Sequence, residues 1–269
     1  MSIELADFKT LALTRVGPVL HVTLSRPAQA NAMSMVMVRE LGALLAQAEM
    51  DGRTRVIVLR GAGGHFCAGA DAADLAAARM RMAVDPSALI DVSTAVGNLC
   101  VAYADTPLVL IAVLEGMCMG GCFGLACVAD VVLADETVEF RLPEASRGEV
   151  PAAVLPFLMQ RVGYSDARRL GVTGASVRAA EALALRLVHE VHAENRLDSA
   201  LGRVLDEVLQ NAPGAVAATK ALLARARLAQ PAALVHAAAE AGSRAALGAE
   251  AADAADALRH LRKAPWVPD

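Results

Sequence analysis

An uninterrupted apolar run constrains the fold of this chain more than any other stretch. Residues 108–114 read Leu-Val-Leu-Ile-Ala-Val-Leu, which is the pattern of a β-strand buried on both faces. A glycine-rich turn follows at 116–121, and residues 123–129 are small and apolar enough for a buried helix. Because such a turn presents free backbone N–H groups, we expect the chemistry here. The alternative is a turn whose small residues serve packing alone.

Composition excludes several classes of function. Of the 269 residues 56% are hydrophobic and 3% aromatic, with a net charge of −4, so bases have few stacking partners and a nucleic-acid partner is not expected. The N-terminus lacks a secretory pattern, and Glu115 interrupts the longest apolar region, so we predict no membrane span. The cysteines contain no C-x-x-C pair and indicate reduced, buried thiols in a cytoplasmic protein. They are Cys67, Cys100, Cys118, Cys122 and Cys127.

The first part of the chain alternates between strand and helix patterns. Residues 9–15 and 19–25 alternate in polarity and predict a β-hairpin. Ser34 is placed to cap a helix over residues 35–50, and residues 55–60 predict a third strand.

The C-terminal part differs from the rest. Strands and helices alternate through residue 190, whereas 197–261 reads as successive helices broken at Pro213 and Pro231. This order predicts an α/β fold with a helical C-terminal subdomain. We therefore divide the chain into a core with the active site, residues 1–196, and a helical subdomain, residues 197–269.

Two glycine-bearing turns follow buried strands and suggest one shared site. They are Ala68-Gly69-Ala70-Asp71 and Met119-Gly120-Gly121-Cys122. If both open helices toward the same cleft, each can donate an N–H to one oxygen, as an acyl thioester requires when its carbonyl becomes an enolate. Two unrelated loops are the alternative.

Glu144 is the candidate acid or base. It follows Pro143, beyond a short predicted strand and near the expected first turn of a helix, where a carboxylate is compatible with the helix dipole. Enolate chemistry needs one proton donor or acceptor near the α-carbon, and a carboxylate can supply it. A solvated glutamate at a helix start is the alternative interpretation.

Taken together, these segments resemble the crotonase superfamily, the enoyl-CoA hydratase/isomerase family. The resemblance covers nearly the whole chain, and five spaced motifs agree. The matching pieces are Val22–Pro27 with Asn31–Met33, His65–Asp71, Gly116 with Met119–Cys122, Ala129-Asp130 with Phe140–Glu144, and Arg262–Trp266.

The resemblance implies a crotonase-type spiral of ββα units whose C-terminal helices build a homotrimer or a hexamer. It implies an acyl-CoA thioester as substrate, held at its thioester oxygen by the N–H groups of Ala70 and Gly121, with Glu144 as the catalytic acid/base. No metal is implied, and no cofactor other than the coenzyme A of the substrate. The implied substrate- and CoA-binding residues are Arg26, Ala30, Phe66, Cys67, Ala68, Asp71, Gly120, Gly124, Arg262 and Lys263, the last two near a neighbouring subunit's CoA phosphates.

One departure limits what the resemblance implies about activity. Hydratases of the family carry two glutamates, of which the second matches Glu144, but the first position holds Gly124. Glycine cannot activate water, so the two-carboxylate scheme does not transfer intact. We predict a hydratase or dehydratase of an α,β-unsaturated acyl-CoA. The alternatives are an enoyl-CoA isomerase that uses Glu144 alone and a catalytically silent acyl-CoA-binding protein.

The acyl group is a further hypothesis. Hydratases of branched, glutaconyl-type thioesters look most similar, because they tolerate Phe-Gly-Leu-Ala after the Gly-Gly turn and share the segment at 151–157. A distal carboxylate on such a substrate needs a cationic partner. Arg141 and Arg147 are the candidates for that role.

Overall fold

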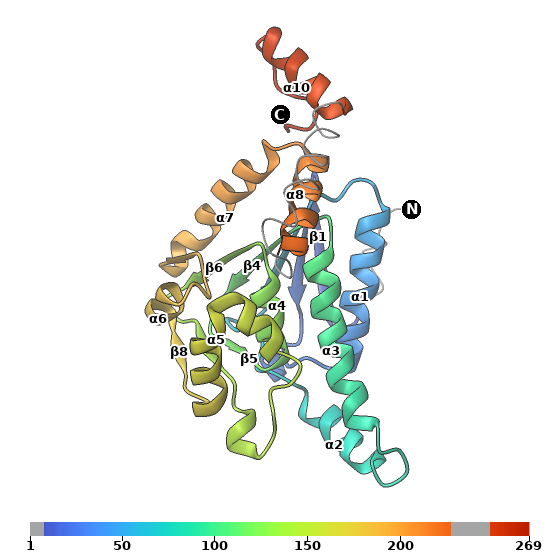
Figure 1. Ribbon diagram of the computed structural model, residues 1–269, viewed down its shortest axis with the longest axis vertical. Coiled ribbons are helices and arrows are strands. Elements are labelled where there is room, and N and C mark those ends of the chain that lie inside the picture. The colour runs from blue at the N-terminus through green and yellow to red at the C-terminus, as the bar shows by residue number, and fades with distance from the viewer. Residues whose placement is uncertain (1–7, 227–247, 269) are drawn as a thin grey trace. The chain divides into compact units, whose positions relative to one another are not determined.

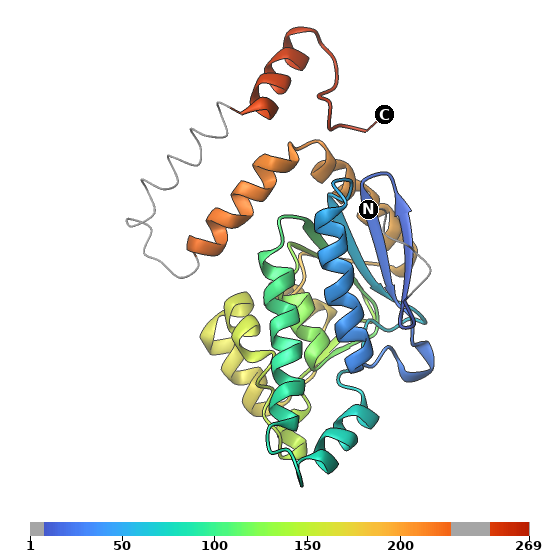
Figure 2. The same ribbon diagram turned by 90° about the vertical axis from the view of Figure 1, so that its right-hand side faces the viewer.

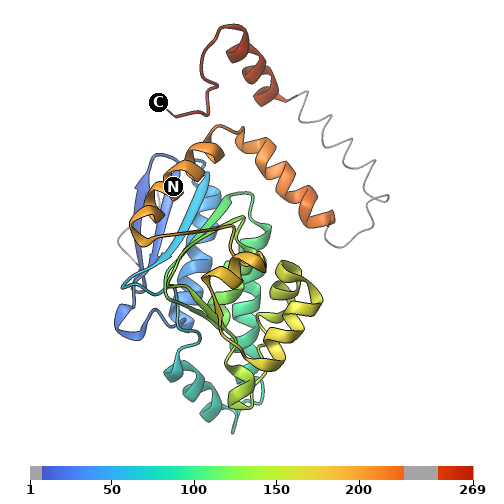
Figure 3. The same cartoon turned by 90° about the vertical axis from the view of Figure 1, so that its left-hand side faces the viewer.

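A computed structural model describes residues 8–226 and 248–268 of the chain. The chain divides into two compact units. The first contains the residues up to 104 together with 110–200, and the second contains 105–109 together with the residues from 201 onward. Figures 1 to 3 show the elements of both units from three sides.

The strands and helices follow one another in mixed order along the chain. The strands are β1 Leu11–Val16, β2 Val19–Leu24, β3 Val56–Gly61, β4 Val109–Leu114, β5 Met117–Met119, β6 Val131–Asp135, β7 Glu139–Arg141, β8 Val177–Arg178 and β9 Glu190–His192. The α-helices are α1 Met35–Met50, α2 Ala72–Arg81, α3 Ala88–Asp105, α4 Gly121–Val128, α5 Leu155–Thr173, α6 Ala179–Ala184, α7 Glu194–Leu209, α8 Pro213–Ala226 and α10 Ala249–Arg259. The 3-10 helices among the described residues are η1 Pro27–Gln29 and η2 Glu144–Arg147.

The larger sheet has six strands in the order β1-β2-β3-β4-β6-β9. β1 and β2 form the predicted antiparallel hairpin, and β2 pairs with β3 in parallel. β4 pairs with β6, and β6 with β9, again in parallel. All six residues of β4 are buried, which confirms the prediction of a strand covered on both faces. The predicted α/β class is therefore confirmed.

Helices α1 and α3 run side by side along the larger sheet (Figures 1 and 2). The hydroxyl of Ser34 accepts a hydrogen bond from the N–H of Met37 at 3.2 Å, so α1 begins where the capping residue predicts. The buried hydroxyl of Tyr103 on α3 donates to the carbonyl of Leu41 on α1 at 3.1 Å. This bond fastens the two helices to each other.

One predicted helix start needs correction. Glu144 does not begin an α-helix but stands first in the short 3-10 helix η2, so the helix-dipole argument made from the sequence does not apply to it. The span labelled α5 is interrupted at Gly163, where φ is 79° and ψ is 168°, so it consists of two helices that meet at a bend. Only glycine adopts this conformation readily, so the bend is local and both halves stay helical.

Most of the described residues of the second unit from 201 onward are helical, in α7, α8 and α10. Its α8 begins at Pro213, which suits the first position of a helix because proline lacks an N–H. The N–H groups of Gly214 and Ala215 donate to the Glu250 carboxylate of α10 at 2.7 and 3.0 Å. Pro231 lies outside the described residues. No described helix is long and apolar enough to cross a membrane.

We expect Tyr103→Phe to lower the free energy of unfolding by about 1 kcal/mol, because it removes one buried hydrogen bond while preserving the ring. Urea denaturation followed by circular dichroism measures this change. Tyr164→Phe is the matched control, since Tyr164 is 67% exposed and should leave the unfolding midpoint unchanged. Equal midpoints for both variants would show that the α1–α3 bond contributes nothing to stability.

Candidate active site

The two glycine-bearing turns meet, as the sequence predicts. The N–H of Cys67 donates to the carbonyl of Met117 at 2.8 Å, and the N–H of Met119 donates to the carbonyl of Cys67 at 3.0 Å. These bonds hold the turn at 67–71 against β5, the strand that leads directly into the Gly-Gly turn. Two segments about fifty residues apart in the chain therefore form one site.

Backbone N–H groups from both turns are available for a ligand. The N–H groups of Ala68 and Asp71 donate to the carbonyls of Ala30 and Met33, respectively. Over the described ranges, the N–H of Ala70 has no hydrogen-bond acceptor, and the same holds for Gly121, the first residue of α4. The predicted pair of oxyanion donors is thus free to bind an oxygen.

Gly120 allows the turn to approach both partners closely. Its φ of 53° and ψ of −136° are unfavourable for a residue with a side chain. A Cβ at this position would lie 3.2 Å from Cα of Gly69, 3.4 Å from Oε1 of Glu144 and 3.6 Å from N of Ala70. The Glu144 carboxylate and the Ala70 N–H therefore lie beside the same turn.

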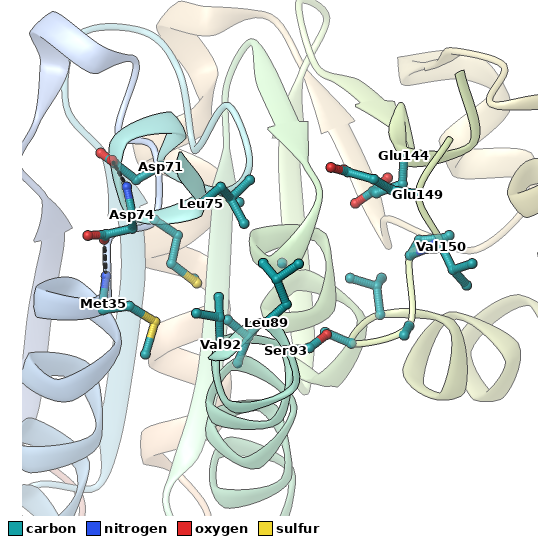
Figure 4. Close-up of a pocket in the computed structure, with 18 residues that line it drawn as sticks. Met35, Asp71, Asp74, Leu75, Leu89, Val92, Ser93, Glu144, Glu149 and Val150 are labelled. Atoms are coloured by element: carbon teal, nitrogen blue, oxygen red, sulfur yellow. Dashed lines mark hydrogen bonds between the residues drawn. The ribbon is translucent and has the colours of Figure 1, made fainter. Parts of the chain in front are cut away.

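A cavity of about 220 Å³ opens at this turn. Leu75 on α2 and Leu89 on α3 form part of its apolar wall, and Glu144 and Glu149 lie opposite them (Figure 4). An apolar pocket with a few polar groups is typical of a small-molecule site. The apolar lining residues are Met33, Met35, Ala70, Leu75, Leu89, Val92, Val96, Gly121, Val150, Pro151, Ala152, Ala153 and Val154, and the polar ones are Asp71, Asp74, Ser93, Glu144 and Glu149.

Glu144 has the least compensated carboxylate in this cavity. Its Oε2 is buried, and no described residue forms a hydrogen bond with it. Burial is the main cause that raises the pKa of Glu144. A hydrogen bond from its own N–H and the charge of Arg147 oppose the rise, and the charge of Glu149 adds to it. A carboxyl group with a raised pKa is suited to donate and accept protons near neutral pH.

The other carboxylates of the cavity have partners. Asp71 forms an ion pair with Arg26 at 2.8 Å and accepts N–H groups at the start of α2. Burial raises the pKa of Asp71, but these hydrogen bonds outweigh burial and the net pKa is lowered. Asp74 accepts the N–H of Met35 at 2.7 Å. Glu149 forms an ion pair with Arg79 of α2.

The remaining predicted binding residues do not line the cavity. Arg26 forms an ion pair with Asp71, which lines the cavity, but does not line the cavity itself. Ala68 donates its N–H to the carbonyl of Ala30 at 2.9 Å. Phe66 is fully buried. Arg262 and Lys263 belong to the second unit, where they contact Asp256 and the carbonyl of Pro268. Coenzyme A binding by these residues stays a prediction.

Gly124 is buried beneath the cavity instead of lining it. A Cβ there would lie 2.8 Å from Sγ of Cys100, which occupies the space that a longer side chain needs. A side chain at this position, such as the family's first glutamate, therefore requires Cys100 to shift. Arg141 donates from Nε to the carbonyl of Gly174 at 3.0 Å, and neither Arg141 nor Arg147 lines the cavity.

The prediction of five reduced cysteines is wrong for two of them. Cys67 and Cys122 form a disulfide between the two turns, which brings together residues 55 positions apart. The sequence contains no sign of this pairing, because only the meeting of the turns places the two side chains in contact. Cys100, Cys118 and Cys127 are free and buried, as predicted. Burial raises the pKa of Cys100 to about 12, so its thiol is not a nucleophile.

Sequence reasoning missed the walls of the cavity and its acid Glu149. The apolar wall comes from α2 and α3, whose residues showed only helix-forming patterns. Glu149 follows Glu144 by five residues in the segment that precedes α5. The only sequence signal for Glu149 was that it lies two residues before the 151–157 segment, which the family resemblance includes.

Comparison with known proteins identifies the class that this fold and site define. The family described as enoyl-CoA hydratase/isomerase matches residues 15–257. The chain therefore belongs to the enoyl-CoA hydratase/isomerase family, and its fold is of the crotonase type, as the resemblance implied.

Particular members are similar along most of their length. The solved structure of Pseudomonas aeruginosa AtuE has a TM-score of 0.92 and 42% identity, covering 97% of this chain and 100% of that chain. Mevalonyl-coenzyme A hydratase SIDH of Beauveria bassiana is 34% identical, covering 76% of this chain and 74% of the relative. Carnitinyl-CoA dehydratase of Proteus mirabilis is 33% identical, covering 79% of each.

We expect unfolded, unreduced protein to expose three titratable thiols and the reduced protein five, because the disulfide blocks Cys67 and Cys122. Reduction should lower the free energy of unfolding by about 2–4 kcal/mol, since the bond closes a long loop of the unfolded chain. Thiol titration in denaturant and calorimetry measure the two effects. A count of five thiols without reductant would contradict the disulfide.

Proposed function

We propose that the protein adds water to an α,β-unsaturated acyl-CoA thioester, or removes it in reverse, with Glu144 exchanging the proton at C2. The observation that carries the proposal is the position of the Glu144 carboxylate. It lies beside the Gly-Gly turn, in an apolar cavity, near the free N–H groups of Ala70 and Gly121. Membership in the family supports an acyl-CoA substrate.

The two N–H groups supply the stabilisation that the reaction needs. When water adds at C3, the electron pair of the double bond moves toward the thioester oxygen and forms an enolate. Hydrogen bonds from Ala70 and Gly121 stabilise that negative charge, and removal of one such donor typically costs about 10²–10³ in rate. Protonation at C2 by Glu144 then completes the hydrated product.

The cavity lining favours an uncharged acyl group. All its charged residues are acidic, and no lysine, arginine or histidine occurs among the described residues of the lining. A distal carboxylate of the glutaconyl type would face these acids without a cation to compensate it. We therefore favour an apolar or branched enoyl group, and the glutaconyl-type substrate becomes the hypothesis to test against it.

An enoyl-CoA isomerase is the second candidate function. Cys100 occupies the space at Gly124 where the family's first glutamate would stand. Moving a double bond between C2–C3 and C3–C4 requires proton transfer but no water, and Glu144 alone can perform it. A silent acyl-CoA-binding protein is less consistent with the uncompensated Glu144 carboxylate.

We expect Glu144→Gln to reduce turnover of the preferred enoyl-CoA by about 10²–10⁴, because the amide cannot exchange a proton with C2. Binding of a saturated acyl-CoA, measured by calorimetry, should change little. Glu136→Gln is the control, since Glu136 is an exposed acid in the β6–β7 turn. Unchanged turnover in Glu144→Gln would remove this residue from the mechanism.

The same variant should be more stable than the wild type at neutral and alkaline pH. Burial raises the pKa of Glu144, so folding disfavours its ionised form. Below the ordinary glutamate pKa of about 4.3 the wild-type carboxyl is neutral, and its burial costs no stability through ionisation. As pH rises from there through the raised pKa, the free energy of unfolding of the wild type falls relative to that of the variant. Melting temperatures at acid and alkaline pH measure this difference. A difference that shrinks as pH rises would contradict the assignment.

A comparison of substrates tests the reaction and the acyl group together. We expect crotonyl-CoA to gain one water with a higher kcat/KM than 3-methylglutaconyl-CoA, because the lining lacks a cation for the distal carboxylate. Product masses and loss of enoyl-thioester absorbance measure the conversion. Preference for the glutaconyl substrate would overturn our assignment of the acyl group. Mass-neutral conversion of a 3-enoyl-CoA without any hydration would favour the isomerase.

A further inference from the structure

Glu149 occupies the catalytic cavity together with Glu144. Both side chains line it, and Figure 4 shows them next to each other, opposite the α2–α3 wall. The N–H of Glu149 donates to the carbonyl of Glu144 at 3.0 Å, which closes the short segment that carries both acids. The negative charge of Glu149 also raises the pKa of Glu144, so the two carboxylates interact.

The two acids have opposite electrostatic environments. Glu144 has a buried, unpartnered Oε2, which favours the protonated carboxyl group. Glu149 forms an ion pair with Arg79, and a guanidinium partner favours the ionised carboxylate. Paired carboxyl groups in contrasting surroundings are the usual arrangement for one acid and one base in the same site.

Water addition requires two proton transfers at different atoms, one from the water and one to C2. Glu144 can serve C2, whereas Gly124 offers no group that could activate water. The other carboxylates of the cavity are already committed, Asp71 to Arg26 and the start of α2, and Asp74 to the N–H of Met35. Arg79, the partner of Glu149, has a side chain that is 55% exposed, so water can reach the pair.

We propose that Glu149 is the catalytic base that activates water, with Arg79 as its positioning residue, and that Glu144 is the acid that protonates C2. This inference rests on the proposed hydratase function. It adds the residue that activates water, which the proposed function did not assign. Glu149, in the segment between η2 and α5, would thus take the role that the first glutamate has in family members with a carboxylate at position 124.

The Glu149 carboxylate takes one proton from water as the water oxygen bonds to C3. The C2–C3 π electrons move to the thioester oxygen, where the Ala70 and Gly121 N–H groups hold the enolate. Glu144 then gives its proton to C2, and the thioester carbonyl re-forms. Proton transfer from Glu149 to Glu144 through solvent restores both groups, so the net reaction adds one water.

Glu149→Gln separates water activation from enolate chemistry. We expect kcat for hydration to fall by about 10²–10⁴, because the amide cannot accept the water proton. Exchange of the α-protons of butyryl-CoA in D₂O, followed by mass spectrometry, should stay within threefold of the wild type, since it needs only Glu144 and the two N–H donors. Glu144→Gln should lose both activities, and Glu136→Gln neither.

Arg79 provides a second, independent measurement. In Arg79→Gln kcat for hydration should fall while KM and α-proton exchange change little, because Glu149 loses the ion-pair partner that positions its carboxylate. Arg79→Lys should largely restore the wild-type kcat because it keeps the charge. A change in KM alone, with kcat unchanged in Arg79→Gln, would show that the ion pair only shapes the cavity and would overturn the role of Arg79.

The outcomes distinguish this inference from the function on which it rests. If the wild type hydrates an enoyl-CoA and Glu149→Gln does so within threefold of its rate, Glu149 is not the base and the hydratase function stands. If Glu149→Gln loses α-proton exchange as well as hydration, its role is structural and the inference fails. If the wild type hydrates no enoyl-CoA but moves a double bond, the proposed function itself fails, and the inference with it.

Discussion

The active site depends on the contact between two backbone turns, residues 67–71 and 117–121. Reciprocal hydrogen bonds between Cys67 and the β5 strand hold them together, and the disulfide from Cys67 to Cys122 joins the same two segments covalently. This contact leaves the N–H groups of Ala70 and Gly121 free at the mouth of one cavity. Because a displacement of about 1 Å can cost a hundredfold in rate, a rigid connection at this point matters for catalysis.

The charge distribution of the cavity follows from how each acid is compensated. Asp71 and Asp74 serve the ends of α2 and α1, and Glu149 has the guanidinium of Arg79. Glu144 alone combines burial with an unpartnered oxygen, which raises its pKa. The walls from α2 and α3 intensify this effect, because apolar side chains exclude the water that would otherwise solvate the carboxylate.

Several elements could be predicted because the forces that form them are local. The apolar run at 108–114 has the length and composition of a strand covered on both faces, and Ser34 caps α1 by accepting the N–H of Met37, three residues further on. Other features could not be predicted. Glu144 begins a 3-10 helix instead of an α-helix, and Cys67 and Cys122 form a disulfide. Such outcomes depend on packing against distant residues.

The sequence by itself determined the α/β class, the two glycine turns and Glu144, since strand burial, turn chemistry and the spacing of motifs are properties of short segments. The tertiary structure decided which of these groups meet. It paired Cys67 with Cys122, filled the space at Gly124 with Cys100, and placed Glu149 in the cavity beside Glu144. The physical reason is that contacts between residues far apart in the chain depend on how complete elements pack, which no local pattern specifies.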